Sequence, residues 1–141
     1  MLDKHRQRRR TRDGEVMCGV DQAPLSATPR ALTVAVNRFV EGDAQLNAPD
    51  TLAFQLKTGN LYVIEDNANG DVWACLPDKA DRDIKTDGCV RVLSVRDQSA
   101  EPTGFEFAPD GRSAILAIQH SPPDGLGDTD DILVIEGFKL R

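Results

Sequence analysis

A chain of 141 residues, 40% hydrophobic and 28% charged, has the composition of one folded domain rather than of a disordered chain. Its net charge is −6, from 17 basic and 23 acidic residues. Residues 14–141 contain 11 of the basic and 21 of the acidic residues, and this acidic body disfavours nucleic acid as a partner. No run of about 18 apolar residues occurs, which excludes a transmembrane helix, and no membrane partner is expected.

Residues 1–30 are predicted to form a disordered basic lead. Lys4 and five arginines lie within the first 13 residues, and glycines and prolines follow without a sustained hydrophobic period. Such a run also resembles a nucleic-acid patch, but charge blocks at termini are usually solvated arms. No apolar stretch of signal-peptide length follows the charges, so no export signal is expected in this chain.

The next segments favour strands, and from Asn47 the chain repeats itself. Residues 31–40 are rich in β-branched and aromatic side chains, which favours a strand. Residues 48–54 then correspond to residues 101–107 at an offset of 53, so that Pro49 matches Pro102. In each copy a glycine-containing turn leads into an apolar second strand.

The repeat unit contains about four short strands. In the first copy a third strand is expected over 71–76, after the Asn69-Gly70 turn, and a fourth over 89–95. In the second copy a third strand is expected over 131–136. Four strands recurring every 50 residues or so are typical of a β-propeller, whereas the rival fold, a seven-stranded sandwich, does not require a repeat.

The predicted fold class is therefore all-β, with about two four-stranded β-propeller blades in an incomplete ring. The partial propeller spans 31–141, with one blade at about 48–95 and the other at about 101–138. Because a blade buries its faces only against neighbours, two blades leave an apolar face open on each side. The chain is thus expected to self-associate, to complete a ring with other propeller blades, or to be a segment of a longer protein.

Acidic residues are expected to gather at one rim of these blades. The first two strands of a blade are antiparallel neighbours, so the start of one lies beside the end of the other. This places Asp50 near Glu65 and Asp66 in the first blade, and Glu101 near Gln119 and His120 in the second.

Clustered carboxylates repel one another unless a cation intervenes, and oxygen-rich clusters suit Ca²⁺. We therefore predict a divalent-metal site containing Asp50, Asp66 and Glu101, with Glu65 as a fourth candidate. The alternative is that the two aspartates cap turns and that Glu101 merely precedes a proline.

Four other residues are candidates for function or stabilisation. His120, with Gln119 beside it, is a candidate contact for phosphate or another ligand, or simply a hydrogen-bonding residue at a strand end. Cys75 and Cys89 end and begin neighbouring strands, so they are a candidate disulfide in an oxidising compartment and small buried residues in a reducing one. No nucleophile motif is present, so the catalytic residues stay unassigned.

Seven motifs in order resemble the C-terminal part of the PhoX-like alkaline phosphatases, over about residues 37–141. They are APDTLAF (48–54), GNLYVIEDN (59–67), DVWACLPD (71–78), DGCVR (87–91), AEPTGF (100–105), IQHS (118–121) and DDILVIEGF (130–138). Members of that family are six-bladed propellers that hold calcium and iron at the central channel and hydrolyse phosphate monoesters in the periplasm or outside the cell.

The resemblance implies a truncated phosphatase segment whose parent activity is metal-dependent hydrolysis of small phosphate esters. It implies Ca²⁺ and Fe³⁺ as parent cofactors, but Cys18 lies in the unmatched residues 1–36, so the cysteine that binds iron in the family has no counterpart. The chain alone is therefore an uncertain enzyme. The alternatives are a non-catalytic calcium-binding or interaction module, a lactonase-like propeller hydrolase, and a gene fragment without function.

Overall fold

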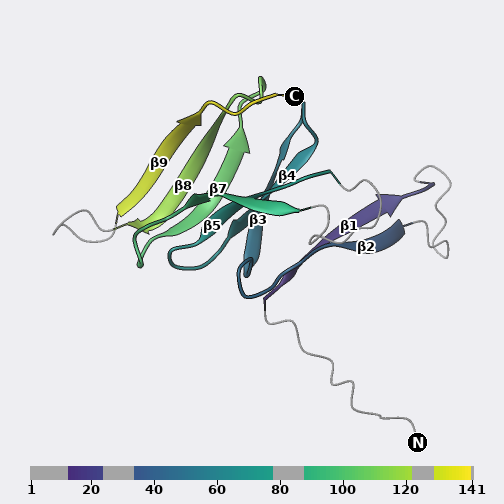
Figure 1. The fold of residues 1–141 in the computed structure, drawn as a ribbon, viewed down its shortest axis with the longest axis horizontal. Coiled ribbons are helices and arrows are strands. Elements are labelled where there is room, and N and C mark those ends of the chain that lie inside the picture. Colours follow the sequence, from purple (N-terminus) through teal and green to yellow (C-terminus); the bar gives the residue numbers. More distant parts are fainter. Residues whose placement is uncertain (1–12, 24–33, 78–87, 122–128, 141) are drawn as a thin grey trace, which may run out of the picture.

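The computed structural model describes residues 13–23, 34–77, 88–121 and 129–140, and these residues form only β-structure. Nine strands make three antiparallel sheets of two, four and three strands. The sheets follow one another along the chain and in space, with the four-stranded sheet in the middle (Figure 1). The predicted all-β class with blade-like sheets is confirmed. No helix in the described ranges is long and apolar enough to cross a bilayer.

The first sheet is a hairpin of β1 (Glu15–Asp21) and β2 (Val34–Glu41). The expected strand at 31–40 corresponds to β2. The prediction of a disordered lead is wrong for Glu15–Asp21, because these residues form β1 and pair with β2. The partner strand lies too far along the chain for a local sequence pattern to reveal the pairing. Residues 1–12 and 24–30 of the predicted lead lie outside the described residues.

The other two sheets contain the predicted strands in chain order. The four-stranded sheet consists of β3 (Pro49–Gln55), β4 (Asn60–Glu65), β5 (Asp71–Cys75) and β6 (Cys89–Ser94). The three-stranded sheet consists of β7 (Glu101–Phe107), β8 (Ser113–Ser121) and β9 (Thr129–Glu136). The second blade therefore has three strands in the described part of the chain, where four were expected.

The repeat extends to the pairing of individual residues. The β3–β4 register recurs in β7–β8 53 residues later: Phe54 pairs with Leu61 in one sheet, and Phe107 with Ala114 in the other. Each first strand also shows a pairing irregularity directly after its N-terminal proline. Since bulges re-aim a strand at a fixed point, their equivalent placement shows two copies of one structural unit.

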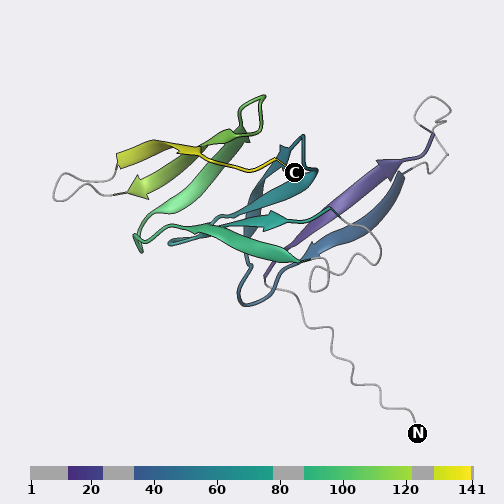
Figure 2. The same cartoon turned by 45° about the horizontal axis from the view of Figure 1, so that its top comes forward.

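Hydrophobic packing contacts both faces of the middle sheet. On one face Tyr62 and its neighbours pack against Phe105 and Leu116 of the three-stranded sheet. On the other face Val63 and Trp73 pack against the β1–β2 hairpin. Figure 2 shows this order, with the hairpin on one side of the middle sheet and β7–β9 on the other.

Polar bonds fix how the two blades meet. The buried amide of Gln55 donates from Nε2 to the carbonyl of Gly111 at 2.8 Å, and the hydroxyl of Thr51 donates to the carbonyl of Thr103 at 2.7 Å. Gly111 has φ +70°, a backbone conformation that glycine adopts without steric cost. The first strands β3 and β7 therefore lie side by side at equivalent heights.

The candidate disulfide is formed. Cys75 and Cys89 are cross-strand partners of β5 and β6, and their sulfur atoms are bonded. The bond joins the two ends of the connection between β5 and β6. Residues 78–87 of that connection lie outside the described ranges. Cys18 is a free, exposed cysteine on β1.

Candidate functional site

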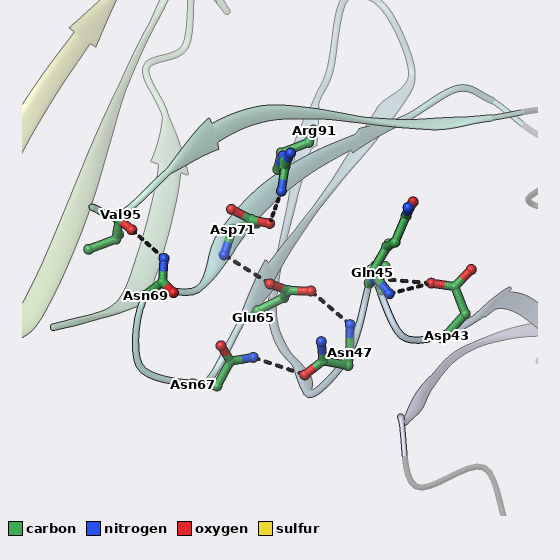
Figure 3. A network of polar contacts seen from close by, with 10 residues as sticks. Asp43, Gln45, Asn47, Glu65, Asn67, Asn69, Asp71, Arg91 and Val95 are labelled. Atoms are coloured by element: carbon green, nitrogen blue, oxygen red, sulfur yellow. Dashed lines mark hydrogen bonds and ion pairs between the residues drawn. The ribbon is translucent and has the colours of Figure 1, made fainter. Parts of the chain in front are cut away.

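A buried polar site in the described part of the chain is built around Glu65, the last residue of β4. Its side chain is 3% exposed. Oε1 accepts a hydrogen bond from the backbone N–H of Asn47 at 2.7 Å, and Oε2 accepts one from the backbone N–H of Asp71 at 2.9 Å (Figure 3). One carboxylate thus joins the loop before β3 to the start of β5.

Two opposing effects act on the proton affinity of Glu65. Burial raises the pKa of this carboxyl group, while the backbone N–H groups of Asn47 and Asp71 lower it; burial dominates, and the pKa is raised. The buried indole Nε1 of Trp73 lies beside the carboxylate and also favours its charged form. No described group accepts a well-aligned hydrogen bond from that Nε1.

An ion pair closes the other side of this site. Asp71 Oδ2 accepts a hydrogen bond from Arg91 Nη1 at 3.0 Å, and the guanidinium of Arg91 lies 5.9 Å from the centre of the Trp73 ring. At that distance the cation is attracted by the electron-rich ring face. The side chain of Asp71 is mostly buried and that of Arg91 is largely exposed.

Amide side chains complete the rim of the same hollow. Asn67 donates from Nδ2 to Asn47 Oδ1 at 3.1 Å, and Asn69 donates from Nδ2 to the Val95 carbonyl at 3.0 Å. Together with Glu65, Asp71, Trp73 and Arg91, these groups line a hollow of about 520 Å³. The hydrogen bonds among these residues chiefly hold strand ends and loops together.

Strand pairing brings the segments that carry the first-blade acids together, but the carboxylates of Asp50, Glu65 and Asp66 do not converge. Pro49 pairs with Glu65, as antiparallel pairing predicts. Asp50 is exposed at the pairing irregularity of β3, and its Oδ2 lies 3.3 Å from the hydroxyl oxygen of Thr51, whose single proton is donated to the Thr103 carbonyl. Asp66 is exposed as well, and Glu65 is held by two backbone donors.

The second-blade residues do come together as the sequence suggests. Glu101 and Gln119 are cross-strand partners, and the Gln119 amide donates to Glu101 Oε1. His120 Nε2 lies 3.6 Å from the same oxygen. The backbone of His120 has φ +59°, which is uncommon for a residue other than glycine and often marks a functional or tightly constrained position.

The described residues do not fit a preformed metal centre. Among these residues no group of three or more His, Cys, Asp or Glu side chains could hold a metal ion. Fe³⁺ has no cysteine ligand in this set either, because Cys75 and Cys89 are bonded to each other and Cys18 stands alone on β1. The Ca²⁺ and Fe³⁺ sites therefore stay predictions.

Asp71 and Arg91 contribute to this site although the sequence did not single them out for it. A signal was available, because pairing Cys75 with Cys89 sets Trp73 opposite Arg91 in the same hairpin, as observed. The position of Asn47 had no such signal, since it depends on how the loop before β3 folds back over Glu65.

Comparison with known proteins gives no relative: neither a protein-family profile, nor a curated protein, nor a solved structure matches this chain. The resemblance to PhoX-like phosphatases consequently rests on the sequence motifs alone.

Proposed function

We propose that this chain is a non-catalytic β-propeller module that acts by packing an open blade face against a further blade. The proposal corresponds to the interaction module considered from the sequence. It is supported by one comparison between equivalent faces of the two blades.

The middle sheet directs one apolar face at the next sheet. Four of its residues are almost completely buried there: Tyr62, Ile64, Val72 and Ala74. The strand register assigns each an equivalent in the third sheet, and we call this second set the tail face: Ile115, Ala117, Ile132 and Val134.

The tail face has the composition of a buried blade face but lies in solvent. Ile132 and Val134 are each 68% exposed, and Ile115 is close to half exposed. A contiguous exposed apolar surface on a soluble protein commonly marks an interaction site. Because the same positions are buried between the two blades of this chain, another sheet of the same kind is the partner that fits.

The polar groups of the described residues argue against catalysis by this chain alone. Glu65 is occupied by backbone donors, and Asp50 and Asp66 project into solvent without a third ligand. No pair of a nucleophile and a general base is evident in the sequence.

A chromogenic phosphate monoester, offered with Ca²⁺ and Fe³⁺, tests the proposal. We expect no turnover above that of buffer with metals. In parallel, replacing Val134 by Lys should leave the melting temperature of the monomeric chain, measured in dilute solution, almost unchanged, because the residue is exposed there. Turnover by the isolated chain, or collapse of the fold on this exposed substitution, would contradict a passive packing role.

A second candidate function is phosphate-ester hydrolysis by a completed propeller, to which this chain contributes one part of the rim. The contact of His120 and Gln119 with Glu101 supports it, because an imidazole and an amide at a channel mouth suit the recognition of a phosphoryl oxygen. In that case small phosphate esters are the substrates.

The second candidate is tested by adding the missing blades as a separate chain. Activity that appears only in the mixture, and that His120→Ala reduces at least tenfold while the same complex forms, would support it. A complex that forms but hydrolyses neither a phosphate ester nor a lactone would favour the non-catalytic module.

A further inference from the structure

We propose that the partner of the tail face is a second copy of this chain, bound head to tail through the exposed side of β3. This inference rests on the proposed packing function and names its partner. The surface on the second copy consists of Leu52 and Phe54, which we call the head patch.

The head patch is the repeat equivalent of a surface that already receives a blade. Leu52 and Phe54 occupy the positions of Phe105 and Phe107 in the next blade. Within one chain those two rings pack on Tyr62, at centroid distances of 5.5 and 4.8 Å.

The tail face supplies the matching half of that contact. Ile115 is the equivalent of Tyr62, the residue that packs on Phe105 and Phe107. Placing Ile115 of one copy on Leu52 and Phe54 of another repeats, between chains, the part of the internal arrangement that lies over the first strand. The contact is confined to β3, because Leu61 and Val63, the equivalents of Ala114 and Leu116, are already covered by the hairpin.

The head patch is open because the hairpin covers only part of its side of the middle sheet. The hairpin core reaches Leu61 and Val63 on β4 and Trp73 on β5. Phe54, on β3, stays 61% exposed, and Leu52 nearly half exposed. In the described part of the chain the hairpin contributes two strands, and the space beside it over β3 is where a complete blade would place further strands.

The two surfaces differ, so the contact is heterologous. A tail face cannot bind a tail face by the same geometry. An open assembly therefore keeps one free head patch at one end and one free tail face at the other. Heterologous contacts of this type close into a ring or continue as a chain. Because blades in a propeller are related by rotation about a common axis, a closed ring is the expected product.

Two single variants and their mixture test the proposal on the full chain. Ile115→Lys blocks the tail face and Phe54→Lys blocks the head patch, each by placing a charge in an apolar contact. Val90→Lys, on the edge strand β6, is the matched control, because Val90 is 60% exposed and lies on neither surface. Circular dichroism first establishes that each variant is folded.

Molar mass is then measured by sedimentation velocity at about 100 μM, a concentration at which contacts with micromolar dissociation constants are populated. We expect the wild-type chain and the Val90→Lys control to exceed the monomer mass of 15.4 kDa, and each blocked variant to run at that mass. Mixing the two blocked variants should give a 1:1 dimer that grows no further, because only one intact tail face and one intact head patch remain.

Each other outcome is informative. A folded wild-type chain that stays monomeric, or a mixture of blocked variants that stays monomeric, would overturn pairing between copies. A wild-type monomer without phosphatase turnover leaves the packing module standing with a different blade as its partner. A monomer that turns over phosphate esters would instead refute the packing module itself. If the wild-type chain forms very large assemblies, the capped dimer of the mixture still decides the question.

Discussion

Replacing Glu65 by Ala should strongly destabilise the fold, although no ligand is involved. The substitution removes the acceptor of two backbone hydrogen bonds, from Asn47 and Asp71, in a buried site. Leaving a buried donor unsatisfied costs about 1–3 kcal/mol, so two donors give a loss of about 2–6 kcal/mol in the free energy of unfolding. This is a large fraction of the about 5–15 kcal/mol that stabilises a typical domain.

Thermal unfolding followed by circular dichroism measures this loss. For a chain of this size about 1 kcal/mol lowers the melting temperature by roughly 3–4 °C, so a decrease on the order of 10 °C is expected. Asp66→Ala is the control, because it removes a neighbouring carboxylate that is exposed. Equal melting temperatures for the two variants would show that Glu65 is not a structural acceptor and would make it available again as a metal ligand.

Three further predictions concern the same rim and the blade edge. Because burial raises the pKa of Glu65 above its ordinary value of 4.5, the folded state binds this proton more tightly than the unfolded state. The contribution of this proton to stability is thus complete below pH 4.5 and is lost as pH rises through the folded-state pKa of Glu65. In urea titrations repeated over this pH range, Glu65→Gln should abolish that loss of stability. A pH profile of stability that is unchanged by the substitution would contradict this prediction. Reducing the Cys75–Cys89 bond, which spans a sequence separation of 14, should cost about 3 kcal/mol of unfolding free energy in denaturant titrations, whereas the Cys18→Ser control should cost little. Millimolar Ca²⁺ should leave the melting temperature unchanged, since the described acids do not converge, and a rise that Glu101→Gln removes would instead restore the predicted calcium site.

Much of the fold could be predicted because its signals are local or periodic. The strands of both blades follow from alternating and apolar runs between turn residues, and the 53-residue offset aligns Pro49 with Pro102 in the amino-acid sequence itself. The disulfide follows from two cysteines at the ends of neighbouring strands. In each case the deciding residues lie close in sequence or repeat at a fixed interval.

The candidate site was predicted less well, because it depends on the direction of individual side chains. The antiparallel pairing brought Glu101 to Gln119 and His120 as expected. It also placed Pro49 opposite Glu65, but the irregularity after Pro49 leaves the Asp50 carboxylate in solvent. A shift of one residue in a strand turns a side chain to the other face, which no count of acidic residues reveals.

By itself, the amino-acid sequence determined that this protein is an all-β repeat with a strand order, a candidate cysteine pair and an excess of apolar blade faces. Only the tertiary structure decided that Glu15–Asp21 is a strand, that Glu65 is a buried structural acceptor, and that Leu52 and Phe54 remain open while Val63 is covered. The physical reason is that burial and hydrogen-bond partners arise from segments distant in the chain, whereas propensity and periodicity act over a few neighbouring residues.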